Sequence, residues 1–321
     1  MEDVNSRADG VDRDAIAAAY HRTSPYIRRT PTIAVDAADL GLVGAEAPVT
    51  LKLECLQHAG SFKARGAFTS MLLRDVGANG VAAASGGNHG VAVALAAQRL
   101  GHKATIFVPE ISSPEKTRRI RDLGADLVVG GKLYADALAA CEAFIAKSGG
   151  MGIHAYDAPE TLIGQGSVAL ELEAQAPAID TLLVAVGGGG LIGGIAAWYE
   201  HRIRIVAVEP ATSNALNAAF TAGHPVDVDV SGIAADSLGA RRVGALMWPI
   251  AETYVHDAIV VSDAAIGAAQ RLLWDKVRVV AEPGGATALA ALTAGIYKPA
   301  KGERVGVIVC GANTDAVRFD R

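Results

Sequence analysis

One lysine of this sequence is hard to explain as an ordinary surface charge. Lys63 follows Gly60, Ser61 and Phe62, and small residues come directly after it. A lysine amine in a partly dry pocket loses its preference for the charged form, so it can attack a carbonyl group and form an imine. The segment therefore predicts a nucleophilic lysine.

Four consecutive glycines form the second candidate for chemistry. Gly187, Gly188, Gly189 and Gly190 follow the apolar run 181–186, and a helix-like stretch starts at Leu191. Glycines at such a turn let backbone N–H groups point at one spot, and the N-terminus of the helix adds partial positive charge. The pattern predicts a phosphate-binding turn built without basic side chains.

A dinucleotide-binding fingerprint is an alternative interpretation of this turn. Its G-x-G-x-x-G spacing fits Gly188, Gly190 and Gly193, and Glu209 lies near the position expected of an acidic residue that binds the ribose. The spacing alone leaves a nicotinamide cofactor open.

Two further segments place polar side chains at the ends of strand-like runs. Ser85 and Asn88, in the turn 85–90, offer a hydroxyl and an amide to an anionic or phenolic oxygen, although either could simply cap the next helix. His89 lacks a second ligand at metal-binding spacing, so we expect a structural side chain. Cys310 ends the run 305–309, where an inert core thiol is the ordinary interpretation.

These segments lie in a chain whose strand-like and helix-like patterns alternate. Such alternation implies parallel sheets with right-handed crossovers, and ligands of these sheets bind at the carboxyl ends of the strands. The N-terminal residues 1 to about 11 are polar and are expected to be frayed. Strands are expected at 49–53, 81–84, 105–108, 127–129, 181–186, 203–208, 259–261 and 305–309, and helices at 12–21, 62–74, 89–100, 114–123, 135–147, 161–175, 191–202 and 263–274.

Composition narrows the class of protein. The 321 residues suit two lobes or one large α/β domain, and with 51% hydrophobic but only 5% aromatic residues the core must consist of Ala, Val, Leu and Ile. A net charge of −5 without a basic block argues against nucleic acid as a partner. We find no signal-peptide pattern, no apolar run long enough for a membrane, and no disulfide framework among Cys55, Cys141 and Cys310. We therefore expect a soluble, cytoplasmic protein.

Together, the motifs resemble those of the fold-type II pyridoxal-phosphate enzymes of the serine/threonine dehydratase family. They occur in the order and at the spacings of that family, from about residue 50 to the C-terminus. The resemblance decides against a nicotinamide cofactor, because a dehydrogenase has no use for the lysine segment. The matching segments are 60–63, 85–90, 187–190, 208–210, 282–286 and 310–313.

The resemblance implies an α/β fold of the tryptophan synthase β-like type, with two open, twisted, mostly parallel sheets and flanking helices. It implies a small domain of residues 67–152 inserted into a large domain of residues 1–66 and 153–321. Pyridoxal 5'-phosphate would lie between the two domains. The expected partners are a small amino-acid substrate and a second copy of the chain in a homodimer.

The family pattern also implies a role for each residue of the site. Lys63 would hold the cofactor through an imine and then take the Cα proton of the substrate. Cys310 would be a neutral partner of the pyridine nitrogen that favours elimination over transamination. The cofactor phosphate would be held by the N–H groups of Gly187, Gly188, Gly189, Gly190 and Leu191. Asn88 would bind the phenolic oxygen of the ring, and Phe62 would pack against the ring or belong to the ordinary core. The substrate carboxylate would be held by Ser61, Ser85 and the turn amides near Gly87 and His89.

The implied activity is elimination of the β-hydroxyl group of L-threonine or L-serine, which gives a 2-oxo acid and ammonia. The alternatives are a related enzyme for another β-substituted amino acid such as hydroxyaspartate, an amino-acid racemase, and a binding protein without turnover. Gly86 stands where the racemases of the family have a serine, whose hydroxyl lies on the cofactor face opposite the lysine. We therefore expect deamination to outrun racemisation.

Two segments depart from the family pattern. Glu209, Ser213 and Ala215 align with a divalent-cation site whose third acidic ligand is missing here. The missing ligand argues against Mg²⁺ or Mn²⁺ without deciding it, and a monovalent cation stays open, with Glu209 as a possible ligand. The segment 230–240 resembles the substrate-facing loop of the family, but its residues 234–237 are not the commonest form, which leaves the preferred substrate open.

Overall fold

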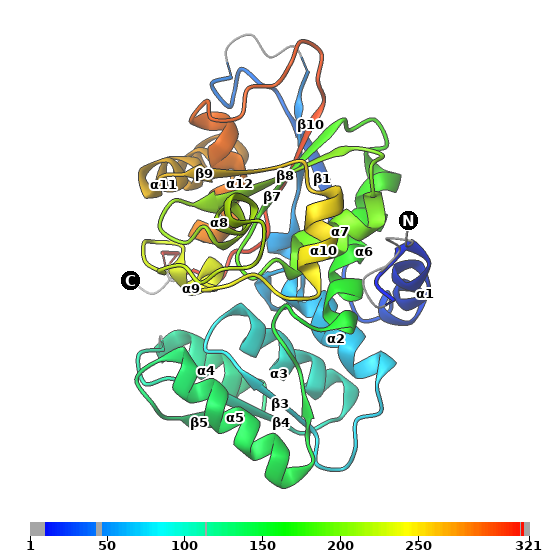
Figure 1. The fold of residues 1–321 in the computed structure, drawn as a ribbon, viewed down its shortest axis with the longest axis vertical. Coiled ribbons are helices and arrows are strands. Elements are labelled where there is room, and N and C mark those ends of the chain that lie inside the picture. The colour runs from blue at the N-terminus through cyan, green and yellow to red at the C-terminus, as the bar shows by residue number, and fades with distance from the viewer. Residues whose placement is uncertain (1–9, 43–46, 113, 315, 318–321) are drawn as a thin grey trace.

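Figure 1 shows the computed structural model of the chain, an α/β structure with two separate β-sheets. It describes residues 10–42, 47–112, 114–314 and 316–317. The segment predicted to be frayed, residues 1 to about 11, therefore lies almost entirely outside the described residues. The two-sheet architecture predicted from the sequence is confirmed.

The larger sheet has six strands in the order β1-β2-β10-β7-β8-β9. β1 is antiparallel to β2, and every other neighbouring pair in this sheet is parallel. The carboxyl ends of β2, β7 and β10 therefore lie at one edge of the sheet, where ligands of such sheets bind. The strands are β1 (Thr32–Val35), β2 (Val49–Lys52), β7 (Thr181–Ala185), β8 (Arg204–Pro210), β9 (Asp257–Val261) and β10 (Val305–Ile308).

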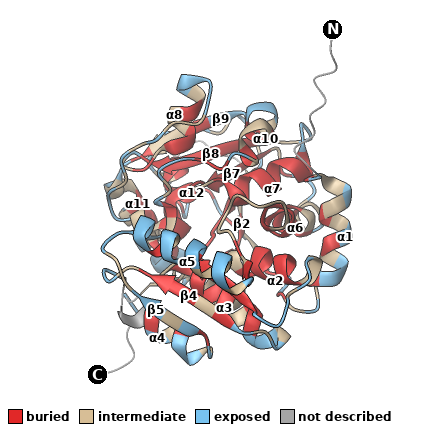
Figure 2. Ribbon diagram, turned by 60° about the horizontal axis from the view of Figure 1, so that its bottom comes forward, coloured by how far each residue is buried: buried red, intermediate tan, exposed pale blue. Residues whose placement is uncertain are grey.

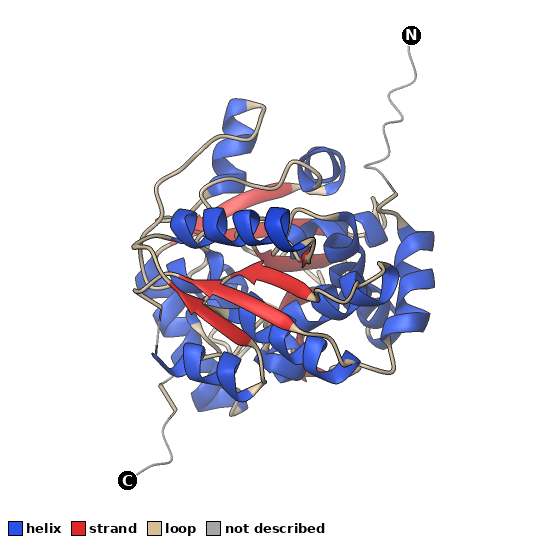
Figure 3. Ribbon diagram, turned by 90° about the horizontal axis from the view of Figure 1, so that it is seen from below, coloured by secondary structure: helices blue, strands red, loops and turns tan. Residues whose placement is uncertain are grey.

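The smaller sheet is fully parallel, in the order β5-β4-β3-β6. Alternate residues of β3 point to opposite faces of the sheet. Val81 and Ala83 belong to the apolar cluster that includes residues of α3, and Ala82 and Ala84 belong to the apolar cluster that includes residues of α5. The sheet is thus covered by helices on both faces, as Figure 3 shows. Its elements are β3 (Val81–Ala84), α3 (Asn88–Leu100), β4 (Ala104–Val108), α4 (Pro114–Asp122), β5 (Asp126–Val129), α5 (Tyr134–Ser148) and β6 (Met151–Gly152).

The remaining helices pack around the larger sheet and against the smaller lobe. Figure 2 shows that the strands of the larger sheet and the inner helices are mostly buried, with exposed residues gathered in loops and outer helix faces. α12 packs on β7, β8, β9 and β10, and α2 contacts both α6 and α3. These helices are α1 (Arg13–Thr23), α2 (Lys63–Leu73), α6 (Pro159–Gln175), α7 (Gly190–Tyr199), α8 (Ala215–Ala222), α9 (Ala235–Leu238), α10 (Met247–Tyr254), α11 (Asp263–Leu272) and α12 (Pro283–Thr293).

Glycines let the central helices come unusually close, which suits a core poor in aromatic residues. A Cβ atom at Gly164 of α6 would lie 2.7 Å from the Cα atom of Gly66 in α2. One at Gly166 would lie 2.9 Å from the carbonyl oxygen of Gly194 in α7. Any side chain at these positions would push α2 and α7, which both begin at the site described below, away from α6.

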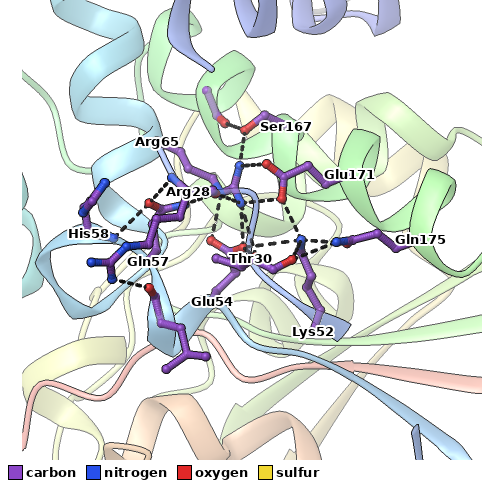
Figure 4. A network of polar contacts seen from close by, with 12 residues as sticks. Arg28, Thr30, Lys52, Glu54, Gln57, His58, Arg65, Ser167, Glu171 and Gln175 are labelled. Carbon is purple, nitrogen blue, oxygen red and sulfur yellow. Dashed lines mark hydrogen bonds and ion pairs between the residues drawn. The ribbon is translucent and has the colours of Figure 1, made fainter. Parts of the chain in front are cut away.

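A cluster of charged side chains lies wholly inside the protein between α2, α6 and β2 (Figure 4). Arg65 binds Glu54 through Nε and Nη2 at 2.8 and 2.7 Å, and Glu171 through Nη1 and Nη2 at 2.9 Å each. Lys52 adds a contact to Glu171 at 2.7 Å. We call Lys52, Glu54, Arg65 and Glu171 the buried ion cluster; two positive charges balance two negative ones.

The predicted strands and helices are present, with ends that differ by a few residues. One helix is clearly shorter than predicted: α7 ends at Tyr199 because Glu200 has a left-handed φ of 52°. The sequence patterns did not predict β1, β6 and the helices α8, α9, α10 and α12. The domain division at residues 66/67 and 152/153 stays a prediction.

Candidate active site

Lys63 is the first residue of α2, and it is half-buried. Nζ donates to the carbonyl oxygen of Ala155 at 2.7 Å and lies 5.1 Å from the centre of the Phe62 ring. Burial lowers the pKa of Lys63 to about 8, although the nearby Cys310 and Glu282 act in the opposite direction. A larger share of this amine is therefore neutral, and nucleophilic, than of an exposed lysine.

The lysine segment lies directly against the segment that follows β10. The backbone N–H of Phe62 donates to the carbonyl oxygen of Cys310 at 3.2 Å, and Ser61 forms an antiparallel bridge with Gly311. Ser61 is fully buried, yet its hydroxyl has no hydrogen-bond partner among the described residues. A buried hydroxyl without a partner is costly, so its presence favours a ligand that binds beside Lys63.

Cys310 is a protonated thiol at this place. Its side chain is 4% exposed, and burial raises its pKa above the ordinary value, as does the neighbouring Glu282. Sγ contacts the carbonyl oxygen of Gly284 at 3.3 Å. The structure thus offers a neutral sulfur group, as the sequence prediction for Cys310 requires.

The glycine turn presents unpaired backbone donors. Among the described residues, the N–H groups of Gly187, Gly188 and Gly189 have no hydrogen-bond acceptor. They precede α7, which begins at Gly190 with Leu191 as its second residue, so the partial positive charge of the helix adds to theirs. This arrangement fits a phosphate group.

Close neighbours explain why the turn needs glycine. A Cβ atom at Gly188 would collide with the ring of Tyr156, and one at Gly189 with the side chain of Met247. At Gly187 a Cβ atom would lie 2.9 Å from the Cα atom of Leu238. The side of the turn that a Cβ atom would occupy is therefore filled by protein.

The second glycine turn leads into α3, which begins at Asn88. Ser85 accepts a hydrogen bond at Oγ from the N–H of Gly87 at 3.2 Å. Nε2 of His89 lies 2.9 Å from the carbonyl oxygen of Ile153. Burial, together with the nearby charge of Lys63, lowers the pKa of His89 to about 3. The His89 ring is thus neutral and bound to backbone, which leaves its amide as the group able to contact a substrate.

The short helix α9 connects these turns. Asp236 lies against Gly87, Leu238 against Gly187, and Ser237 against Gly284, which is part of the 282–286 motif. Asn88 in turn donates to Glu282 at 2.5 Å. The structure therefore brings together all the predicted site segments, 60–63, 85–90, 187–191 and 310, next to the predicted substrate-facing loop 230–240.

Glu209 lies against the first turn of α8. Both carboxylate oxygens accept backbone N–H groups of α8, from Leu216 at 2.9 Å and Asn217 at 2.7 Å. Burial raises its pKa to about 8. The described part of the chain contains no group of three His, Cys, Asp or Glu residues able to hold a metal ion. Glu209 thus caps the first turn of α8, and a monovalent cation at this residue stays a prediction.

Several residues of the site were given no role by the sequence. The carbonyl of Ala155 and the ring of Tyr156 belong to an ordinary-looking loop, and Asp236 comes from a four-residue helix. Glu282 and Asn313 lie in recognised motifs, which was the available signal. The complete donor set, a half-buried amine of lowered pKa, free amides at a helix N-terminus, a neutral thiol and a carboxamide, fits pyridoxal phosphate.

The fold and the site define the class of protein. Residues 23–311 match the sequence family described as "Pyridoxal-phosphate dependent enzyme", and the chain belongs to this family. Its cofactor is pyridoxal phosphate, which supplies an electron sink for bonds at the amino-acid Cα atom.

Particular relatives narrow the class further. The chain is 36% identical to a phenylserine dehydratase of Ralstonia pickettii over 97% of this chain and 95% of that protein. It is 37% identical to the biosynthetic L-threonine dehydratase of Escherichia coli over 83% of this chain, which spans only 53% of that enzyme. Among solved structures, maize serine racemase matches with a TM-score of 0.89 and 34% identity, over 95% of this chain and 94% of that chain.

The absorbance spectrum of the cofactor should depend on the charge of the side chain at position 310. Cys310→Ser keeps a neutral partner, so its absorbance spectrum should stay close to wild type. If Cys310 faces the ring nitrogen as predicted, Cys310→Asp would place a carboxylate there, which should protonate the nitrogen, shift the spectrum and increase half-transamination. Absorbance spectroscopy of the purified variants measures this, and identical spectra for all three proteins would remove Cys310 from the site.

Proposed function

We propose that this protein is a pyridoxal-phosphate-dependent ammonia-lyase that acts on L-threonine, L-serine or both. The observation that carries the proposal is the half-buried Lys63, whose amine donates to Ala155 and has a lowered pKa, on a segment whose Phe62 N–H donates to the carbonyl oxygen of Cys310. Threonine dehydratases and a phenylserine dehydratase among the relatives support elimination of water as the reaction.

In this proposal the residues of the chain bind, orient and move a proton. Ser61, Ser85 and the amides of Gly87 and His89 hold the substrate carboxylate, which sets the Cα–H bond toward Lys63. The neutral Lys63 amine takes that proton, and the β-hydroxyl leaves as water with a proton returned by the resulting Lys63 ammonium group. Hydrolysis of the resulting enamine gives the 2-oxo acid and ammonia.

A screen of single amino acids tests the reaction and its substrates. We expect 2-oxo acid and ammonia in equal amounts from L-threonine or L-serine. 3-Phenylserine belongs in the screen because of the relative from Ralstonia pickettii, and hydroxyaspartate because it is the alternative β-substituted substrate. A cofactor-loaded protein that releases no 2-oxo acid from any of the four would overturn the proposal.

Racemisation is the second candidate function, because a hydroxyl group lies beside Gly86. A Cβ atom at Gly86 would lie 2.8 Å from Cβ of Ser112 and would collide with its Oγ. Ser112 thus occupies the space that a serine at position 86 would take, and serine racemase is among the similar structures.

We expect deamination of L-serine to be at least tenfold faster than racemisation. Racemisation needs a group that returns a proton to Cα on the face opposite Lys63, and a proton donor that is not well positioned there loses much of the roughly 10²–10⁴-fold benefit of a placed acid or base. The double variant Gly86→Ser/Ser112→Gly, which avoids the collision, should raise racemisation. Ser112→Ala is the control for a contribution of Ser112 itself. D-serine and pyruvate are followed together, and comparable wild-type rates would favour the racemase.

The domain division, the dimer and the compartment are part of the proposal. The four-stranded sheet falls within residues 81–152, which supports a small inserted domain of residues 67–152. Among the described helices, none is long and apolar enough to span a membrane, and the three cysteines are free and buried. We propose a cytoplasmic homodimer, and sedimentation equilibrium tests the dimer.

A further inference from the structure

The side chain of Asn88 is held by residues from three other segments. Asn313, which follows β10, donates from Nδ2 to Oδ1 of Asn88 at 2.7 Å, and Arg119 of α4 donates from Nη1 to Oδ1 of Asn313 at 2.6 Å. On its other side Asn88 donates from Nδ2 to Glu282, the residue before α12, at 2.5 Å. The four side chains form one line of hydrogen bonds.

Arg119 fixes the direction of every bond in this line. A guanidinium group only donates, so Asn313 must turn its oxygen to Arg119 and its NH₂ group to Asn88. Asn88 must then accept through its own oxygen, which turns its NH₂ group to Glu282. The opposite orientation of either amide would set two donors or two acceptors against each other.

The line leaves one N–H of Asn88 available. Asn313 uses both of its N–H bonds, one on Asn88 and one on the carbonyl oxygen of Ala59 at 2.7 Å. Asn88 uses one of two on Glu282, and among the described residues the other has no acceptor. Asn88 is only 8% exposed and begins α3. Its remaining N–H is therefore a fixed donor inside the site.

Gly60 makes room for this arrangement. It has a left-handed φ of 74°, and a Cβ atom there would collide with Oδ1 of Asn313. Any other residue at position 60 would be strained in its backbone and would displace the side chain that orients Asn88. Gly60 thus leaves space for the side chain of Asn313 and also allows the backbone turn that precedes Lys63.

We propose that Arg119, Asn313 and Glu282 are positioning residues, which fix the amide of Asn88 so that its free N–H binds the ring oxygen of the cofactor. This rests on the proposed function, because it takes Asn88 as the ligand of that oxygen. Donation to Asn88 Oδ1 also polarises the amide and strengthens its N–H as a donor. Since Arg119 belongs to α4 and Asn313 follows β10, the donor is set only while these two segments are in contact.

The variants Arg119→Met and Arg119→Lys test this proposal. Arg119 is only half-buried, so both variants should fold; methionine removes the donor and lysine keeps one. Titrating pyridoxal phosphate into the apo-protein should show a Kd about tenfold higher for Arg119→Met, as expected for one weakened hydrogen bond to a charged group. The visible spectrum of the bound cofactor should also change. Arg119→Lys, and Arg121→Met on the exposed side of the same helix, should stay within about twofold of wild type.

A double variant separates positioning from general weakening. In an Asn88→Ala background, Arg119→Met should have no further effect on Kd, because the residue that it positions is gone. An equal effect in both backgrounds, or an unchanged Kd and spectrum in the single variant, would overturn the proposal. Neither readout needs turnover, so a protein that passes these tests but releases no 2-oxo acid would count against the proposed function alone.

Discussion

Replacing Lys63 with alanine is expected to abolish elimination, with a fall in kcat of at least about 10³-fold. The substitution removes the amine that binds the cofactor and the base that takes the Cα proton. Lys63→Arg should be equally inactive, since a guanidinium stays protonated and cannot form the imine. Release of 2-oxo acid from L-threonine measures the rate, and the exposed Lys276→Ala serves as the control.

A covalent label locates the amine directly. Borohydride should fix the cofactor to wild-type protein, and mass spectrometry should find it on the peptide that contains Lys63. Because burial lowers the pKa of Lys63 to about 8, roughly a tenth of this amine is neutral at pH 7 when the cofactor is absent. An amine reagent should therefore modify it well below the pH at which exposed lysines react. Near wild-type turnover in Lys63→Ala, or a label on another lysine, would refute the assignment.

The sequence predicted the parts of the site that depend on local chain properties. The four glycines 187–190 and the glycine-rich turn 85–90 come directly after apolar runs. Turns of this kind must lie at strand ends beside helix N-termini. Lys63 and Cys310 were found in the same way, from their places beside small residues and at the end of a strand. The family resemblance then joined these segments into one site, and the structure places them together.

Residues that act through distant contacts could not be predicted. Arg119 and Asn313 lie 194 positions apart in the sequence, and nothing near either residue indicates the other. Tyr156 fills the glycine turn because of tertiary packing alone. The helices α8, α9 and α10 were missed because the stretch between β8 and β9 lacks a clear period, and α12 because its Pro-Gly-Gly start is typical of a turn.

The buried ion cluster was also beyond prediction from the sequence, because charged residues are normally placed at the surface. Burial by itself would lower the pKa of Arg65, yet Glu54 and Glu171 raise it above its ordinary value. Burial by itself would raise the pKa of Glu171, yet Arg65 and Lys52 hold it below the ordinary value of 4.5. Each charge is thus stable inside the protein only while its partners remain.

Replacing Arg65 with methionine is therefore expected to lower the free energy of unfolding by roughly 3–5 kcal/mol. The side chain is fully buried and bonded to two carboxylates, so its loss leaves Lys52 as the one cation of the buried ion cluster beside both of them. Urea unfolding at pH 8 measures the change. Arg242→Met breaks an exposed pair with Asp227 and should cost no more than about 1 kcal/mol.

The pH dependence should confirm the cause of this loss. A carboxylate whose folded-state pKa lies below its unfolded value contributes stability above that unfolded value, and the contribution disappears as the pH falls. Glu171 is such a group in the wild type, so its contribution should persist down to about pH 4.5. Without Arg65 the folded-state pKa of Glu171 should rise, so the variant should lose less stability than the wild type as the pH falls below about 4.5, and the difference between the two proteins should narrow. If Arg65→Met instead unfolds within about 1 kcal/mol of wild type at every pH, the cluster does not stabilise the fold, and α2 must be held beside the site by its apolar and glycine contacts alone.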